Sequence, residues 1–185
     1  MRTAAVVVSL ALSAVLIAGC STLNAVGAML GSQVTFTQPQ LQRALDRSFP
    51  TEYDKLGGLV TLRLDRPGLS IPYDSHRLRL RLDASAVTAA ADEPRALGQI
   101  LISSGLRFDS RTLGLHLQDP VIESVDTPGG TMNDASRALI NAWLADYARD
   151  KPVYRLDHDL TQRLVSRRIG AARIQNGVVV LDVSQ

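Results

Sequence analysis

Cysteine is nearly absent from this chain of 185 residues, because Cys20 is the only one. No disulfide can therefore form within the chain, even in an oxidising compartment. Aromatic residues are also scarce, at 4% of the sequence, and the apolar content is mostly Leu, Val, Ala and Ile. This composition suits either a plain hydrophobic core or a smooth apolar cavity, and it does not choose between them.

An excess of one charge is missing as well. The chain has 20 Lys and Arg residues against 18 Asp and Glu residues, and Arg2 is the only charged residue among the first 19. The remainder is close to neutral, with its acidic and basic residues interspersed. Because nucleic-acid binding normally requires a basic face, we expect no nucleic-acid partner.

The common catalytic motifs are lacking too. There is no Gly-x-Ser-x-Gly, no His-Glu-x-x-His and no glycine-rich phosphate loop. We therefore predict no enzyme, no metal site and no cofactor. The nearest candidate is Asp157-His158-Asp159, whose carboxylates could orient a histidine for acid–base or metal chemistry with His76 or His116. The simpler interpretation is that Asp157 or Asp159 caps the helix that follows.

The first twenty residues have the layout of an export signal. A short cationic start, Met1-Arg2-Thr3, precedes an apolar run from Ala4 to Ala18 that only two serines interrupt. The run is shorter than the roughly 18 to 20 residues that a membrane-spanning helix needs. Ile17-Ala18-Gly19-Cys20 then resembles the bacterial lipobox, in which the cysteine receives a diacylglycerol. We predict that residues 1–19 are a signal peptide and that Cys20 is the lipid attachment site.

Ser21 follows this cysteine. Aspartate at that position favours retention at the inner membrane in the enterobacterial sorting rule, so serine indicates the outer membrane by resemblance. Each buried methylene of a lipid chain contributes about 0.8 kcal/mol, so two or three chains give stable attachment. We expect an outer-membrane-anchored protein that faces the periplasm, with residues 20–32 as a lipidated tether without a fixed conformation.

Residues 33–185 predict a single domain. Gln33 to Phe36 indicate a short strand, and Thr37 caps a helix with Pro39 in its first turn. Alternating apolar and polar residues then predict a long antiparallel meander, which is clearest from His76 to Val87. Pro67-Gly68 and Pro72 punctuate its first part, and its last strand contains Leu113, Leu115 and Leu117.

The hydrophobic period changes from two to about 3.6 after Pro128-Gly129-Gly130. This change predicts a helix near 131–149. Its apolar face contains Ala135, Leu139, Ile140, Trp143, Leu144 and Tyr147. A second helix carries Leu160, Leu164 and Val165, and Asn176-Gly177 joins two final strands as a type I′ turn. The predicted fold class is α+β, with a long antiparallel sheet that covers helices on one face, an N-terminal helix and a C-terminal hairpin.

Several motifs along the chain resemble the YceB-like bacterial lipoproteins, a family with a domain of unknown function. They are Thr37-x-Pro39-x-Leu41, Phe108-Asp109, Leu115-x-Leu117 leading to Val121 through Val125, Trp143 with Tyr147, Pro152-Val153-Tyr154-x-Leu156, and Ile174-x-x-Gly177. Together with the lipobox they cover nearly the whole chain after the signal peptide. The resemblance implies a strongly curved antiparallel sheet wrapped around a long helix, similar to the tubular lipid-binding (TULIP-like) domains.

A sheet of this kind can hold an acyl chain on its inner face, so the resemblance supports the hypothesis of a phospholipid or other acyl-chain ligand without itself implying one. The candidate lining residues are the apolar ones that face each other across the sheet and the helix. They are Leu62, Leu64, Leu78, Leu80, Leu82, Leu139, Ile140 and Trp143. Such a stripe also forms an ordinary closed core, and both interpretations stay open.

Three arginines on alternate positions of one strand could contact anionic headgroups, namely Arg77, Arg79 and Arg81. The alternative is the ordinary solvated face of a half-buried sheet, since Asp83 follows on the same face. The leading hypothesis is therefore a non-catalytic lipoprotein that binds a lipid. The second hypothesis is an envelope module that docks another protein and has a closed core.

Overall fold

A computed structural model describes residues 28–30, 32–54, 59–88, 93–128, 130, 132–164 and 167–184. The signal peptide, Cys20 and most of the expected tether lie outside these described residues. The described part contains, in order, β1 (Ala28–Leu30), β2 (Gln33–Thr37), α1 (Gln38–Ser48), β3 (Thr51–Asp54), β4 (Val60–Ser70), β5 (Leu78–Thr88), β6 (Arg95–Asp109), β7 (Gly114–Asp126), α2 (Asp134–Asp150), β8 (Tyr154–Arg155), α3 (His158–Leu164), β9 (Arg168–Gln175) and β10 (Val178–Ser184).

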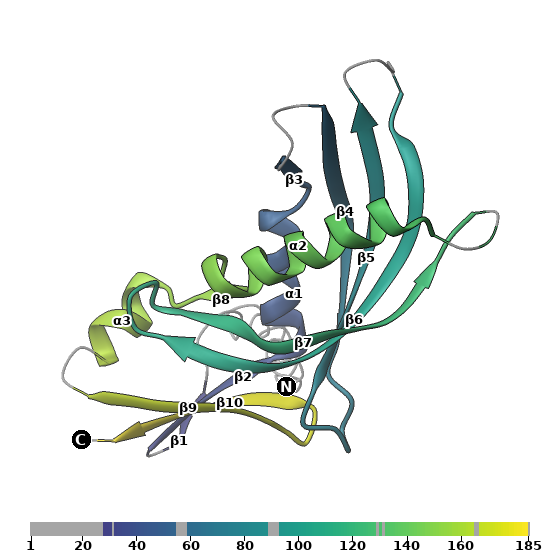
Figure 1. Ribbon diagram of the computed structural model, residues 1–185. Coiled ribbons are helices and arrows are strands. Elements are labelled where there is room, and N and C mark those ends of the chain that lie inside the picture. Colours follow the sequence, from purple (N-terminus) through teal and green to yellow (C-terminus); the bar gives the residue numbers. More distant parts are fainter. Residues whose placement is uncertain are drawn as a thin grey trace, which may run out of the picture.

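The strands form two antiparallel sheets instead of the single sheet expected from the sequence. Sheet A has the order β1-β2-β10-β9, and sheet B has the order β3-β4-β5-β6-β7-β8 (Figure 1). The meander is confirmed in sheet B. The C-terminal hairpin belongs to sheet A and not to the meander. Its strand β10 pairs with the N-terminal strand β2, with Val179 opposite Phe36. The α+β class is therefore correct.

The expected tether is shorter than predicted. Ala28 to Leu30 form strand β1, in which Ala28 lies opposite Thr35 and Leu30 opposite Gln33. This pairing covers the outer edge of β2, which would otherwise leave a row of backbone N–H and C=O groups unpaired. The prediction of a segment without fixed conformation up to residue 32 was therefore wrong for its last part.

Helix α1 begins as the sequence predicts. Thr37 is its N-cap residue, Pro39 lies in the first turn, and Leu41 and Leu45 are buried. The side chain of Gln40 reaches back, and its Oε1 accepts a hydrogen bond from the backbone N–H of Thr37 at 2.7 Å. This contact satisfies an N–H group that precedes the first helical turn.

Strand β4 continues through Pro67-Gly68, where the sequence suggested an interruption. The register with β5 shifts between Asp65 and Gly68, so the proline is accommodated in a β-bulge. Helix α1 covers the edge of β4 beyond this bulge. Gln42 donates from Nε2 to the carbonyl oxygen of Pro67, and its Oε1 accepts from the N–H of Leu69, both at 2.7 Å.

The clearest predicted strand is confirmed in β5, where buried and exposed positions alternate from Leu78 to Leu82. Helix α2 is also confirmed, and it buries Ile140, Trp143, Leu144 and Tyr147. Two expectations at the ends of these patterns were wrong. Ala135 is exposed because α2 contacts the sheet only beyond its first turn, and Leu113 belongs to the β6–β7 turn with φ of 50°.

The final hairpin has the predicted turn and register. Asn176 and Gly177 both have positive φ, of 50° and 73°, as a type I′ turn requires. Ile174 lies opposite Val179, and Ala172 lies opposite Leu181. These side chains face the interior between the two sheets.

Sheet B is long and twisted, but it is neither strongly curled nor closed, and α2 lies across one of its faces (Figure 1). The wrapped sheet that the resemblance implies is therefore not seen. One continuous hydrophobic core contains side chains from both sheets and from α1, α2 and α3.

Candidate functional site

The sheet side of the expected ligand groove is buried. Leu62 and Leu64 on β4 are fully buried, as are Leu80 and Leu82 on β5, and Leu78 is 1% exposed. All five belong to the main core. The alternation that predicted their common face is therefore correct.

The α2 residues that were expected to line the groove belong to the same core as these sheet residues. Ile140 is 1% exposed and Trp143 is 3% exposed, whereas Leu139 is partly buried at the margin of the core. The structure thus brings all eight candidate lining residues together. Their side chains pack in one core, and none of them lines the two surface cavities that lie at β9 and at α3.

An aromatic cluster lies under the C-terminal half of α2. The Tyr147 ring is 5.2 Å from that of Trp143 and 6.0 Å from that of Phe49, measured between centroids. The Tyr147 hydroxyl is buried and has no hydrogen-bond partner among the described residues. Burial raises the pKa of Tyr147 well above its ordinary value, so the phenol stays neutral.

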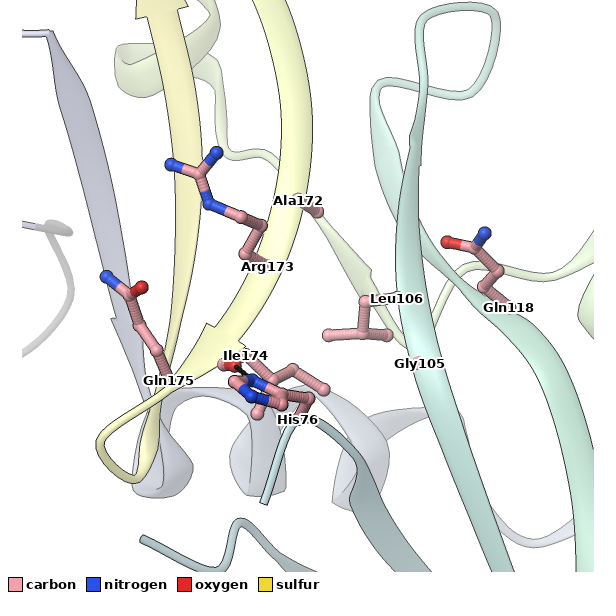
Figure 2. Close-up of a pocket in the computed structure, with 8 residues that line it drawn as sticks. All are labelled: His76, Gly105, Leu106, Gln118, Ala172, Arg173, Ile174 and Gln175. Carbon is pink, nitrogen blue, oxygen red and sulfur yellow. Dashed lines mark hydrogen bonds between the residues drawn. The ribbon is translucent and has the colours of Figure 1, made fainter. Parts of the chain in front are cut away.

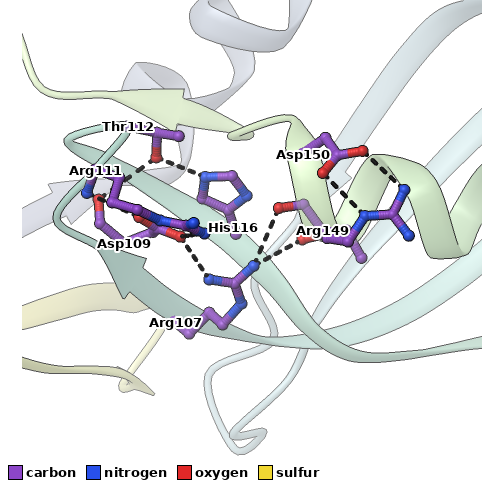
Figure 3. Close-up of polar contacts among 8 residues, drawn as sticks. Arg107, Asp109, Arg111, Thr112, His116, Arg149 and Asp150 are labelled. Carbon is purple, nitrogen blue, oxygen red and sulfur yellow. Dashed lines mark hydrogen bonds and ion pairs between the residues drawn. The ribbon is translucent and has the colours of Figure 1, made fainter.

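Arg107 on β6 holds the C-terminal end of α2 (Figure 3). Its Nη2 donates to the carbonyl oxygens of Ala148 and Arg149, at 3.1 and 3.3 Å. These carbonyls belong to the last helical turn, which leaves such oxygens without partners inside the helix. A cation also interacts favourably with the partial negative charge at this end. Arg107 therefore clamps α2 to sheet B.

Asp109 orients this arginine. One carboxylate oxygen lies 3.2 Å from Nη1 of Arg107, and the other accepts from the backbone N–H of Arg111 at 2.8 Å. The backbone and guanidinium of Arg111, together with Arg107, hold the pKa of Asp109 well below its usual range. The segment Asp109-Ser110-Arg111, where β6 ends, is thus part of the α2 clamp.

His116 lies beside the clamp and is completely buried. Its Nε2 is 2.7 Å from Oγ1 of Thr112, and its Nδ1 has no hydrogen-bond partner among the described residues (Figure 3). Burial and then the charge of Arg107 lower the pKa of His116, while the Ala148 carbonyl and Asp109 oppose this change. The ring is therefore neutral at neutral pH.

The arginines expected at anionic headgroups are mostly engaged within the protein. Arg77 donates from Nη2 to the carbonyl oxygens of Ser103 and Asp119, and Arg79 pairs with Glu123 at 3.2 Å. Arg81 is exposed and has no ion pair among the described residues. Two of the three guanidinium groups thus stabilise sheet B itself.

One cavity of about 330 Å³ lies between β9 and the β6–β7 pair (Figure 2). It is lined by His76, Gly105, Leu106, Gln118, Ala172, Arg173, Ile174 and Gln175. His76 Nδ1 lies 3.0 Å from the carbonyl oxygen of Ile174, so the ring links the β4–β5 connection to β9. A second cavity, of about 290 Å³, lies against Asp159, Gln162 and Arg163 of α3.

The candidate triplet Asp157-His158-Asp159 acts as a helix start. Oδ1 of Asp157 accepts from the N–H of Leu160 at 2.7 Å, which confirms the capping interpretation. His158 is exposed, and its Nε2 lies 2.8 Å from Nε2 of Gln162. His76 and His116 contact other partners, so the structure does not bring the three histidines together.

No group of three or more His, Cys, Asp or Glu residues in the described part is arranged to hold a metal ion. The same residues contain no helix that is long and apolar enough to cross a membrane.

The residues that sequence reasoning missed are Arg107 and Thr112. Arg107 occupies a polar position of an alternating strand, where an arginine normally faces solvent, so its sequence gives no sign of a helix contact. Comparison with protein-family models and with curated proteins gave no match for this chain.

Proposed function

We propose that this protein is a non-catalytic lipoprotein that binds a phospholipid or another acyl-chain molecule. Export and attachment at Cys20 rest on the signal layout and on Ile17-Ala18-Gly19-Cys20, and the outer-membrane location facing the periplasm rests on Ser21. Ligand binding rests on the way α2 packs against sheet B. No cofactor, metal or reaction enters the proposal.

The observation that carries ligand binding is that one helix, fastened at one end, covers the apolar face of a long sheet. Arg107 holds the last turn of α2, and the hydroxyl of Tyr53 donates to Asp146 at 2.5 Å. Among the described residues, no hydrogen bond or ion pair joins the side chains of residues 134–142, the N-terminal half of α2, to the sheet. The N-terminal half of α2 is therefore held by apolar contact alone.

An acyl chain can replace apolar contacts of this kind at little free-energy cost, because hydrocarbon on the ligand substitutes for hydrocarbon of the protein. The ligand would enter between the N-terminal half of α2 and the side chains of β4 and β5. The curved, wrapped sheet implied by the resemblance belongs to this proposal, with sheet B bent around both the helix and the ligand.

Native mass spectrometry and lipid extraction of the mature protein test the proposal. The lipid on Cys20 is covalent, so an extracted or dissociable lipid is a separate molecule. Leu139→Asp places a charge at the margin of the core, and we expect it to abolish lipid recovery. Ala145→Asp introduces the same charge on an exposed position of α2 and should leave recovery unchanged. Mature protein that contains no extractable lipid would contradict the proposal.

A second function is favoured by the close packing of the eight candidate lining residues. A core already filled by its own side chains suits a module that docks another envelope protein through its surface. Crosslinking in intact cells separates the two functions. A single dominant protein partner, recovered with lipid-free protein, favours docking, whereas recovered lipid favours the first proposal.

A further inference from the structure

One stretch near the C-terminus, residues 160–181, contains arginines but no acidic residue. Between Asp159 and Asp182 there is no Asp or Glu, and the same segment contains Arg163, Arg167, Arg168 and Arg173. The rest of the domain interleaves its charges more closely along the sequence, and Asp159, which borders the stretch, lines the same cavity as Arg163. Such a one-signed segment attracts an anionic partner.

Three of these arginines lie around the end of α3 and the start of β9. The backbone N–H of Arg167 donates to the carbonyl oxygen of Leu164 at 2.9 Å, so Arg167 lies beside the end of α3. Arg163 and Arg168 are exposed, and no ion pair to either is found within the described ranges. Arg173 differs from them because it pairs with Asp182 at 2.7 Å.

This basic end lies on the sheet that contains the N-terminal strand. Arg168 is opposite Ser184 on β10, and Asp182 of β10 is opposite Gln33 on β2. The N–H of Val183 also donates to the carbonyl oxygen of Ser32 at 2.7 Å. Adjacent strands are about 4.8 Å apart, so β9 lies only about 14 Å from β1 across sheet A.

The chain between Cys20 and Ala28 limits how far sheet A can lie from an anchored lipid. Eight residues span at most about 28 Å when fully extended. Ala28 of sheet A therefore lies within about 28 Å of a lipid on Cys20. This step rests on the anchoring in the proposed function.

We propose that Arg163 and Arg168 bind the phosphates of anionic phospholipids in the membrane that holds Cys20, so that this end of sheet A lies against the bilayer. A guanidinium matches phosphate oxygens in geometry and charge. Each arginine near an anionic bilayer surface strengthens the association about fivefold. The proposal assigns the contact with anionic headgroups to Arg163 and Arg168 instead of Arg77, Arg79 and Arg81.

Energy transfer in vesicles tests this orientation. The mature lipidated protein carries Ser184→Cys as its only free thiol, labelled with a donor dye, and the vesicles contain an acceptor lipid. We expect stronger transfer in phosphatidylcholine vesicles that contain about one phosphatidylglycerol in three lipids than in pure phosphatidylcholine vesicles.

 

The increase should disappear at high salt, where charges at the surface are screened.

Matched variants identify the arginines. Arg163→Gln with Arg168→Gln should remove the phosphatidylglycerol-dependent increase, which corresponds to a loss of about 25-fold in the docked over undocked ratio. Arg95→Gln with Arg155→Gln removes the same charge from exposed positions of sheet B and should leave the increase intact. An increase that is absent in the unaltered protein, or that both double variants remove equally, would overturn the proposal.

Failure of the Cys20 anchor gives a different result from failure of the arginine–phosphate contacts. Protein acylated on Cys20 floats with pure phosphatidylcholine vesicles whether or not the arginines bind phosphate. Protein without the lipid does not float with them, and the anchoring proposal then fails. Its sedimentation with phosphatidylglycerol vesicles still tests the arginines, because salt-sensitive binding that requires Arg163 and Arg168 supports their role, and equal binding of the double variant contradicts it.

Discussion

The two halves of α2 are held by different interactions. The C-terminal half has directional contacts, namely the Arg107 bonds to two helix carbonyls, the Tyr53 to Asp146 hydrogen bond, and the ring contacts of Tyr147. The N-terminal half has its own cap, in which Asn133 Oδ1 accepts from the N–H of Ser136 at 2.8 Å. Beyond this cap it relies on apolar contact with the sheet.

This difference indicates where the helix would separate from the sheet first. Directional contacts must be broken one by one and leave polar groups unpaired, whereas apolar contacts weaken gradually and can be taken over by a ligand. The clamped half therefore acts as the fixed end and the N-terminal half as the end that can move. The following predictions test this comparison.

Removing the large side chain of the clamped half should have the largest effect. Trp143→Ala deletes a ring that is 3% exposed, and we expect a loss of about 3–5 kcal/mol in the free energy of unfolding. Leu139→Ala at the margin of the core should cost less, about 1–2 kcal/mol, because its site is partly open. Urea denaturation measures both, and equal losses would contradict the difference between the halves.

Removing the clamp itself should have the next largest effect. Arg107→Gln leaves the carbonyls of Ala148 and Arg149 without their charged donor, and we expect a loss of about 1–2 kcal/mol in the free energy of unfolding. Hydrogen exchange should increase most in the last turn of α2. Arg81→Gln is the control, with an expected change within about 0.5 kcal/mol. Unchanged exchange in that turn would show that Arg107 does not fasten the helix.

The local pattern of the sequence was sufficient for much of the fold. Alternation identified β5, the 3.6-residue period identified α2, and Asn176-Gly177 identified the last turn, because each depends on residues close together in the chain. The cap at Asp157 was predictable for the same reason. Among the candidate site residues, the apolar positions all belong to the core or its margin, and their role in lining a ligand site stays a prediction.

The remaining features depend on contacts between distant segments. Alternation shows which face of β10 is buried, but it does not show that β10 pairs with β2 rather than with the meander. Arg77 and Arg107 both occupy polar positions of strands, and nothing nearby in sequence distinguishes an arginine that faces solvent from one that reaches a distant carbonyl. The filling of the space under α2 depends on the same long-range packing.

The clamp region should also make stability depend on pH. Burial lowers the pKa of His116 from its ordinary value of 6.5, so the unfolded chain binds a proton at a higher pH than the folded protein does. The free energy of unfolding should therefore fall as the pH falls below about 6.5, by at most about 1.4 kcal/mol per pH unit. The low pKa of Asp109 adds a separate loss below about pH 4.

Variants of two histidines separate the loss of stability caused by His116 from the loss caused by Asp109. His116→Gln should flatten the dependence between pH 6.5 and pH 5, apart from an offset caused by the altered packing, as urea denaturation at each pH would measure. His158→Gln changes an exposed histidine and should keep the dependence of the unaltered protein. A slope that survives in the His116 variant would assign the acid sensitivity to other groups.

The smallest expected effect is the most direct test of the comparison. Ala138 and Ala145 are both exposed on α2, one in each half, so glycine at either position weakens the helix by about 1 kcal/mol without removing a core contact. Ala138→Gly should speed amide exchange about fivefold within the N-terminal half alone, because that half opens locally. Ala145→Gly lies in the clamped half, which opens only when the domain unfolds, so it should lower the free energy of global unfolding instead. If both variants changed exchange along the whole helix equally, α2 would open as one unit, and a ligand could not enter by lifting its N-terminal half.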